Sequence, residues 1–158
     1  MTENEVLSYL RSLPDTSVVT SSKGDGSPEV AWGDSFAYYR PADDAPDDER
    51  GFQPFVTVVT KNYPDFDTES DLDRDGVFRV NLSVGRTRFE ELLGFPPLEL
   101  EQRRNNIDFS AIDQFIPHPQ YSTQGWISVI NPSELEEELR NLMLEAHGRA
   151  VQRKHRSQ

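Results

Sequence analysis

The chain has 158 residues, which is about the size of one domain, and 35% of them are hydrophobic, so we expect one modest core. Its 28 acidic residues outnumber its 16 basic residues, and the net charge of −12 disfavours nucleic acid and anionic membrane surfaces as partners. The sequence contains no cysteine, which excludes disulfides, thiolate catalysis and thiolate metal sites.

The N-terminal residues are acidic and show no signal-peptide pattern. No apolar run approaches the ~20 residues that a membrane helix needs. We therefore expect a cytoplasmic protein.

A capping-box pattern opens the chain, because Thr2 is followed three residues later by Glu5. Apolar residues then recur at helical spacing as far as Leu13, and Pro14 cannot continue a helix. The pattern predicts an N-terminal helix that Pro14 ends.

The next part of the chain predicts β-strands. Residues 16–21 form the first, and a glycine-containing turn follows at residues 23–26. Residues 29–39 predict one or two further strands. Three aromatic side chains of this range are expected to point inward: Trp32, Phe36 and Tyr38.

Acidic loops and strands alternate in the middle of the chain. Residues 41–49 combine acidic side chains with prolines and predict a solvated loop. Residues 54–60 are apolar and β-branched and predict a strand. A second acidic loop is expected at residues 61–75, and another strand at residues 77–84.

Two short helices are expected after these strands. Residues 86–93 predict a helix that a glycine closes. Phe109, Ile112 and Phe115 have helical spacing and predict a further helix that ends before Pro117.

The last part of the chain predicts a strand followed by a long helix. The strand is expected at residues 126–130, and Ser133 with Glu136 forms a second capping-box pattern. Apolar residues follow at helical spacing: Leu135, Leu139, Leu142, Met143, Ala146 and Ala150. His147 lies beside this stripe and is expected to pack against the core or to contact the helix C-terminus.

These elements predict an α+β fold, in which the N-terminal and C-terminal helices pack on an antiparallel sheet. No internal repeat is visible and no linker separates two cores. We expect residues 1–152 to form a single domain and residues 153–158 to form a frayed basic tail.

Several short motifs are spread along the chain. In order they are the opening helix ending at Leu13-Pro14, Trp32-Gly33-Asp34 with Phe36, PFVTVVTK ending at Lys61, His118, and Gln124-Gly125-Trp126 followed by ISVINP and the terminal helix. In these motifs the chain resembles the MmcQ/YjbR-like proteins. Over nearly its whole length it is similar to a bacterial family of unknown function, through the stretches VAWGD, YPDFDTESDLDR, GVFRVN and QGWISVINP.

The resemblance implies an antiparallel sheet with helices packed against it, of MmcQ/YjbR-like type. DNA binding has been suggested for that superfamily from the shape of its members alone, so the resemblance implies DNA as a ligand on that ground only. It carries over no catalytic residues. The acidic net charge of this chain argues against DNA as a ligand.

One acidic segment matches half of a calcium-binding loop. Asp71, Asp73 and Asp75 alternate before a glycine, as in the first half of an EF-hand, and acids of residues 65–69 can add ligands. The twelfth loop position is Leu82, where an EF-hand has a glutamate. The alternative is a solvated loop whose aspartates cap turns. We expect no cofactor and keep these three aspartates as the weak metal candidates.

His118 lies between two prolines and is the best candidate for acid–base chemistry. Paired with Asp34 it would form an acid–base couple, so these two residues are the catalytic candidates. The alternative is a structural histidine that hydrogen-bonds to the backbone, and we favour that alternative because the sequence shows neither a partner nor a cleft.

Aromatic residues are numerous enough to line a cleft for a small molecule or a peptide. The residues expected to border it are Trp32, Asp34, His118, Tyr121, Gln124 and Trp126. Because no complete catalytic motif is present, the leading hypothesis is a non-catalytic module that binds a small ligand or a protein. The alternatives are an enzyme that uses His118 and Asp34, and a nucleic-acid-binding protein.

Overall fold

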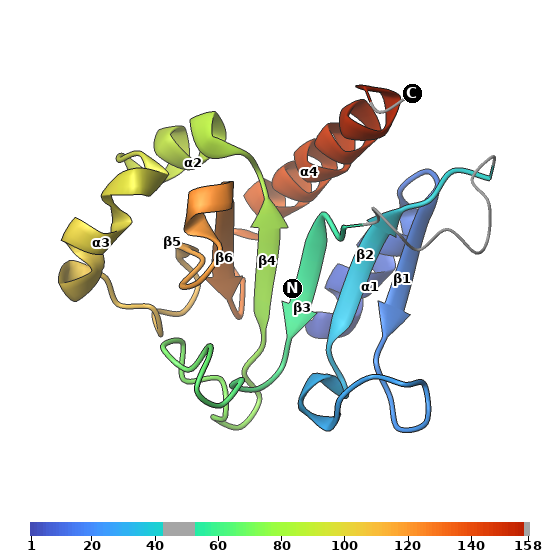
Figure 1. Cartoon of the computed structure of the whole chain (residues 1–158), viewed down its shortest axis with the longest axis horizontal. Helices are drawn as coiled ribbons and strands as arrows, with labels where there is room; N and C mark the ends of the chain where they lie inside the picture. The colour runs from blue at the N-terminus through green and yellow to red at the C-terminus, as the bar shows by residue number, and fades with distance from the viewer. Residues whose placement is uncertain (43–52, 157–158) are drawn as a thin grey trace.

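The computed structural model describes residues 1–42 and 53–156. In these residues six strands form one antiparallel sheet in the order β1-β2-β3-β4-β6-β5 (Figure 1). The strands are β1 (Thr16–Thr20), β2 (Ser35–Tyr39), β3 (Val56–Val59), β4 (Arg79–Ser83), β5 (Phe115–Pro117) and β6 (Trp126–Ile130). The α-helices are α1 (Glu3–Ser12), α2 (Arg86–Leu93), α3 (Leu100–Arg103) and α4 (Glu136–Arg156). Short 3₁₀ turns are η1 (Glu29–Ala31), η2 (Pro97–Glu99), η3 (Arg104–Asn106) and η4 (Ser122–Gln124).

Helix α1 begins at the predicted capping box. Thr2 Oγ1 accepts from the Glu5 amide at 3.1 Å, and a carboxylate oxygen of Glu5 accepts from the Thr2 amide at 3.3 Å. These two bonds satisfy amides that a helix N-terminus leaves without partners. The prediction of an N-terminal helix on an antiparallel sheet is confirmed.

The two faces of the sheet differ because successive side chains of a strand point to opposite sides. In β4 and just after it, Val80, Leu82 and Val84 belong to the main hydrophobic core. Arg79 and Asn81 point to the other side, where they line a cavity. We call the first side the core face and the second the open face.

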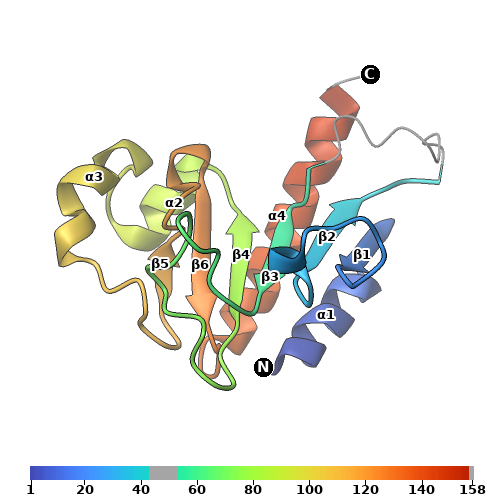
Figure 2. The same cartoon turned by 60° about the horizontal axis from the view of Figure 1, so that its bottom comes forward.

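Helices α1 and α4 cover the core face (Figure 2). The core contains Leu10 of α1, Val56 of β3, Ile127 of β6 and Met143 of α4, each at most 1% exposed. His147 of α4 completes the packing: its Nε2 lies 2.7 Å from the Pro14 carbonyl oxygen, and its ring meets Tyr39 and Phe55 edge to face. Of its two predicted roles, His147 has the packing one.

A loop of residues 60–78 lies over the open face, opposite the helices (Figure 2). It is anchored by Leu72, which is 1% exposed and packs with Val59, Ile116 and Ile130 in a second, smaller cluster. The space between this loop and the strands contains the candidate site.

The predicted helix at residues 109–115 is wrong, because the end of this stretch is strand β5. Asp113 has a positive φ of 55°, a conformation that ends any helix, and its amide donates to the Ile130 carbonyl oxygen at 2.8 Å. Phe109 is buried in the main core, whereas Ile112 is 51% exposed. Helical spacing therefore misled here, since only some of these apolar residues face inward.

Asp113 also caps the approach to α4, in place of the predicted capping box. Its carboxylate accepts from the amides of Ser133, Glu134 and Leu135 at 2.8, 3.0 and 3.3 Å. The Glu136 amide donates to the Ser133 carbonyl oxygen instead of its side chain. The hydrogen bonds from these amides lower the pKa of Asp113, and the bond from Ser133 has the largest effect.

Another correction concerns the inward positions of residues 29–39. Ala37 is the core residue of β2, at 1% exposed, whereas Phe36 is half-buried on the open face. Trp32 and Tyr38 are half-buried as well. The spacing of large aromatic residues predicted the wrong face because a small alanine fills the core position.

The remaining sequence predictions concern the acidic segments and the chain end. Residues 43–49 of the first acidic loop lie outside the described residues, as do residues 157–158 of the predicted tail. Helix α4 continues to Arg156. Among the described helices, none combines the length and hydrophobicity needed to cross a bilayer.

Candidate functional site

A cavity of about 380 Å³ lies between the open face of the sheet and the loop that covers it. Its walls carry six rings: Phe36, Tyr63, Phe66, His118, Tyr121 and Trp126. Four polar side chains, here called the polar floor, also line it: Thr57, Asp67, Arg79 and Asn81. The cavity therefore has aromatic walls and a polar floor.

The polar floor follows from the register of the strands. Thr57 of β3 pairs with Asn81 of β4, which pairs with Ser128 of β6. Side chains paired across neighbouring strands share one face, so these three polar groups meet. Asn81 Nδ2 donates to Thr57 Oγ1 at 2.9 Å, and Ser128 Oγ donates to Asn81 Oδ1 at 2.7 Å.

Arg79 lies two residues before Asn81 on the same face and is 1% exposed. Its Nη1 and Nη2 donate to the two carboxylate oxygens of Asp67, at 3.1 and 2.5 Å. Nη1 also donates to Ser70 Oγ at 2.9 Å, and Nε donates to Asn81 Oδ1 at 2.8 Å. Because a carboxylate pairs with the guanidinium, the polar floor has no net charge.

His118 follows β5 and is 3% exposed. Its Nδ1 accepts from the amides of Gln120 and Tyr121, at 3.0 and 3.1 Å. Burial, and then the positive charge of Arg79, hold the pKa of His118 well below its usual value. The ring is therefore neutral with its proton on Nε2, which makes it a hydrogen-bond donor.

Two exposed aromatic side chains line the same cavity. Phe66 is 50% exposed and Tyr121 is 40% exposed, and their ring centroids lie 6.1 Å apart. Tyr121 also lies 4.9 Å from the His118 ring, which in turn packs edge to face with Trp126 at 6.4 Å. A planar molecule that enters the cavity meets ring surfaces on several sides.

Tyr63 connects this cavity to Asp34. Its hydroxyl donates to a carboxylate oxygen of Asp34 at 2.5 Å. Burial and the neighbouring Asp34 carboxylate raise the pKa of the Tyr63 hydroxyl, so it stays protonated. The ring thus has a fixed orientation in the cavity wall.

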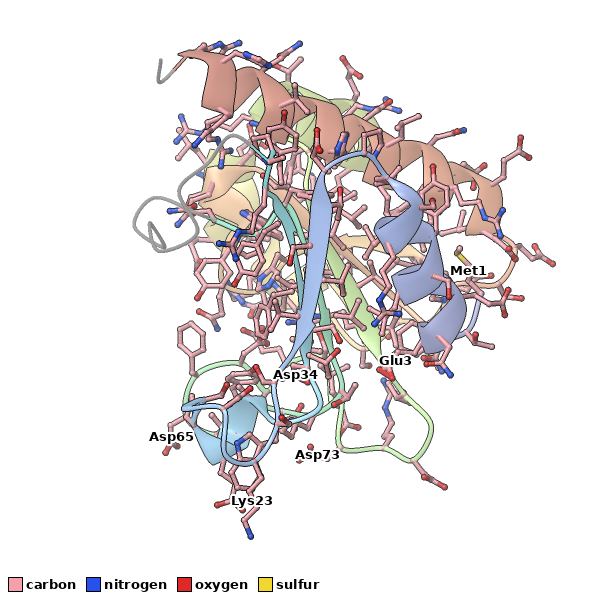
Figure 3. All side chains as sticks on the ribbon, turned by 90° about the vertical axis from the view of Figure 1, so that its right-hand side faces the viewer. Met1, Glu3, Lys23, Asp34, Asp65 and Asp73 are labelled. Atoms are coloured by element: carbon pink, nitrogen blue, oxygen red, sulfur yellow. The ribbon has the colours of Figure 1, made fainter. Side chains whose placement is uncertain are left out.

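Asp34 is completely buried and has a structural role at the end of β3. Its carboxylate accepts from the amide and hydroxyl of Thr60, at 2.8 and 2.9 Å, and lies 3.5 Å from Lys61 Nζ. Lys61 Nζ also donates to the carbonyl oxygen of Trp32. Figure 3 shows Asp34 near the same end of the molecule as Glu3. The pKa of Glu3 is raised, first by the partial burial of Glu3 itself and second by the negative charge of Asp34.

The structure brings together four of the six residues predicted to border a cleft. His118, Tyr121, Gln124 and Trp126 all line the cavity. Trp32 and Asp34 are not among its lining residues, and the Trp32 indole instead donates to the Ser27 carbonyl oxygen at 3.2 Å. Tyr63 lines the cavity and donates a hydrogen bond to Asp34, so it connects Asp34 to the four residues that line the cavity.

The three aspartates of the half EF-hand pattern have separate contacts. Asp73 accepts from the Asn62 amide at 2.9 Å, and Asp71 lies 3.6 Å from Arg74 Nε. Asp75 is exposed. In residues 1–42 and 53–156, no three acidic or histidine side chains are arranged to hold a metal ion.

A second hollow, of about 750 Å³, lies at the start of α1. Its lining includes the charged side chains of Glu3, Asp73, Arg74 and Asp75. Of these four, none is buried, and the hollow is wide and open. The smaller cavity is the better candidate, because buried polar groups such as Arg79 line it.

Comparison with known proteins identifies the family of this chain. The whole chain, residues 1–158, matches a family described as a family of unknown function (DUF6194). The chain belongs to this family. No curated protein and no solved structure matches it. The resemblance of this DUF6194 protein to MmcQ/YjbR-like proteins stays a prediction from its motifs.

Sequence reasoning missed the polar floor of this DUF6194 protein. Arg79 and Asn81 alternate with Val80 and Leu82, which is the signal of a strand with one apolar and one polar side. That alternation marks Arg79 as a side chain off the main core. Its partner Asp67 is 12 residues away, and sequence spacing alone does not reveal the contact.

Proposed function

We propose that this protein binds a small organic molecule in the cavity between the open face of the sheet and the loop of residues 60–78. The supporting observation is a cavity of about 380 Å³ with ring-bearing walls and a few convergent polar groups. Binding sites for small molecules commonly have about 300–1,000 Å³ and this combination of apolar and polar lining.

The exposure of Phe66 and Tyr121 supports this proposal. Both large rings stand partly in solvent at the cavity, next to one another. A bound planar molecule would remove part of both rings from water, and this burial stabilises a complex. A concave site also favours a small molecule over a folded protein partner.

The environments of His118 and Asp34 favour binding over acid–base catalysis. A general base needs a free lone pair near its substrate. The accepting nitrogen of His118 already receives two amides, and the Asp34 carboxylate already receives Thr60 and Tyr63. The net charge of −12 favours a small molecule over nucleic acid.

We also propose that the protein acts in the cytoplasm. Its chain has no cysteine, so its stability does not depend on an oxidising compartment.

The two tryptophans provide a direct test of binding. The chain has only Trp32 and Trp126, so its NMR spectrum contains two indole N–H signals. Trp126 lines the cavity, whereas Trp32 does not and donates to Ser27. In a screen of planar fragments at about 1 mM, we expect ligands to move the Trp126 signal and to leave the Trp32 signal in place.

Rim variants test whether the cavity is the site. Phe66→Ala and Tyr121→Ala should each weaken the binding of such fragments about tenfold, since each removes ring contact worth about 1–2 kcal/mol. Leu98→Ala is the matched control, because Leu98 is 77% exposed and does not line the cavity. The proposal is wrong if no fragment moves the Trp126 signal, or if the control weakens binding as much as the rim variants.

A further inference from the structure

Three buried side chains of the cavity have donor hydrogens without a protein acceptor in the part of the chain that the structure describes. Nε2 of His118 carries a proton, because Nδ1 is the accepting nitrogen, and no acceptor contacts it. Asn81 uses one amide hydrogen on Thr57 and has a second. Arg79 uses four of its five N–H groups and retains one on Nη2.

These donors belong to side chains that line the cavity and have almost no contact with bulk solvent. Arg79 and Asn81 are each 1% exposed, and His118 is 3% exposed. A buried donor without an acceptor is unfavourable, so a ligand atom that accepts from it gains affinity. The cavity therefore favours a ligand that carries a hydrogen-bond acceptor.

The charge of the site selects among possible acceptors. The Arg79 guanidinium is paired with the Asp67 carboxylate at 2.5 Å, and the His118 ring is neutral. The donors therefore come without a surplus positive charge, and a carboxylate ligand would lose its hydration without gaining an ion pair. The net charge of −12 also repels anions at long range.

A cationic ligand fits no better. Both oxygens of the Asp67 carboxylate already accept from Arg79. The groups of the cavity that remain available are N–H donors, and a cationic group has no lone pair to accept from them. A neutral acceptor remains the best match.

We infer that the ligand is a neutral, planar molecule whose carbonyl oxygen accepts hydrogen bonds from His118 Nε2 and from one of the Asn81 and Arg79 donors. Its ring body lies against the walls formed by Trp126, Tyr121 and Phe66. This inference rests on the proposed binding function, and it specifies the ligand class.

Four naphthalene derivatives of similar shape separate the alternatives. The probes are 2-naphthamide, 2-naphthoate, 2-naphthamidine and 2-isopropylnaphthalene, which carry a neutral carbonyl, an anion, a cation and no polar group. Dissociation constants come from titration of the Trp126 indole signal, with the Trp32 signal as internal control. We expect 2-naphthamide to bind at least about tenfold more tightly than each of the other three.

A single variant tests the donor role of His118. In His118→Asn the side-chain oxygen can still accept from the amides of Gln120 and Tyr121, but the Nε2 donor is lost. We expect the affinity for 2-naphthamide to fall about tenfold and the affinity for 2-isopropylnaphthalene to stay the same. In the unmodified protein, 2-naphthamide should also shift the ¹⁵N resonance of His118 Nε2.

Each contrary outcome has a distinct meaning. If 2-isopropylnaphthalene binds as tightly as the amide, the cavity is a binding site but the inferred hydrogen bonds do not form. If 2-naphthoate or 2-naphthamidine binds most tightly, the inferred neutrality is wrong. If no probe moves the Trp126 signal, the proposed binding function fails and this inference fails with it.

Discussion

Arg79 is buried in the middle of a sheet, where a charge is stable only if it is paired and hydrogen-bonded. Its contacts with Asp67, Ser70 and Asn81 satisfy most of its donors. The ion pair therefore fixes the loop of residues 60–78 onto the sheet, and it also provides much of the polar floor. Stability and ligand recognition depend on the same side chain.

Removing one partner of this pair should be costly. We expect Arg79→Leu to lower the free energy of unfolding by about 3–5 kcal/mol in urea denaturation, since it leaves the Asp67 carboxylate buried without its cation. Arg88→Leu is the control, because Arg88 pairs with Glu145 on the surface at 3.0 Å and should cost less than about 1 kcal/mol. The double variant Arg79→Leu/Asp67→Leu should recover part of the loss. Equal effects of the two single variants would contradict this description of Arg79.

His118 should make the stability of the fold depend on pH. Its pKa is lowered in the folded protein, whereas in the unfolded chain it is about 6.5. Below pH 6.5 the unfolded chain therefore binds one more proton, and the stabilising contribution that is complete above pH 6.5 is lost as the pH falls.

The variant His118→Asn isolates this effect because asparagine does not titrate. Between pH 7.5 and 5.5, we expect the unmodified protein to lose about 1 kcal/mol more unfolding free energy than the variant does. Urea denaturation at both pH values measures the difference. Parallel pH dependences of the two proteins would show that His118 titrates normally in the folded state.

At the scale of elements, one glycine determines how η4 joins β6. Gly125 has a φ of 82°, and a Cβ at this position would lie 2.6 Å from the Gly85 carbonyl carbon and 2.8 Å from the Arg86 amide nitrogen. Its own carbonyl oxygen accepts from the amides of Val84 and Gly85. Gln124 and Trp126, on either side of Gly125, both line the cavity. The close backbone contact at Gly125 therefore helps to hold these two side chains in place.

Replacement of Gly125 should therefore cost more than strain at a positive φ alone. We expect Gly125→Ala to be about 1–3 kcal/mol less stable than Gly24→Ala, because an alanine Cβ at 125 collides with backbone atoms. Gly24 also has a positive φ, of 91°, but no atom of the described residues lies within 4 Å of the position of its Cβ. Thermal or urea unfolding of the two variants gives the comparison. A similar loss in both would mean that the backbone near Gly85 moves away easily.

Much of the element order follows from local signals in the sequence. The capping box of Thr2 and Glu5 locates α1, and the apolar run at residues 126–130 coincides with β6. Long-range contacts decide the cases that were wrong. Asp113 ends one predicted helix and caps another element 20 residues later, and nothing close to it in the sequence indicates that partner.

At the scale of the molecule, the site was only partly predictable. His118, Tyr121, Gln124 and Trp126 are neighbours in the sequence, and the structure keeps them in one cavity. The polar floor comes from strands and a loop that the fold brings together, so its members are far apart in sequence. For Asp34 the sequence was misleading. It suggested a reactive carboxylate, but in the structure this carboxylate is buried and accepts hydrogen bonds from Thr60 and Tyr63.

The net charge of −12 should also affect the whole molecule. Self-repulsion destabilises a compact acidic protein, and salt screens it. We expect the melting temperature at pH 7 to rise by about 2–4 °C between 10 mM and 0.5 M NaCl, in response to roughly 1 kcal/mol of relieved repulsion. Near the isoelectric point of about 4.6 the increase should disappear, and an undiminished increase there would point to a cause other than net charge.

The alternation of side chains across the sheet gives the protein two sets of positions that can change independently. Thr57 and Asn81, which line the cavity, can be replaced to change which compounds the protein accepts, while Val56, Leu82 and Ile127 continue to hold the helices. A designer can therefore diversify one set as a library without repacking the other. An inserted residue in β4 would exchange the two sets and destroy both.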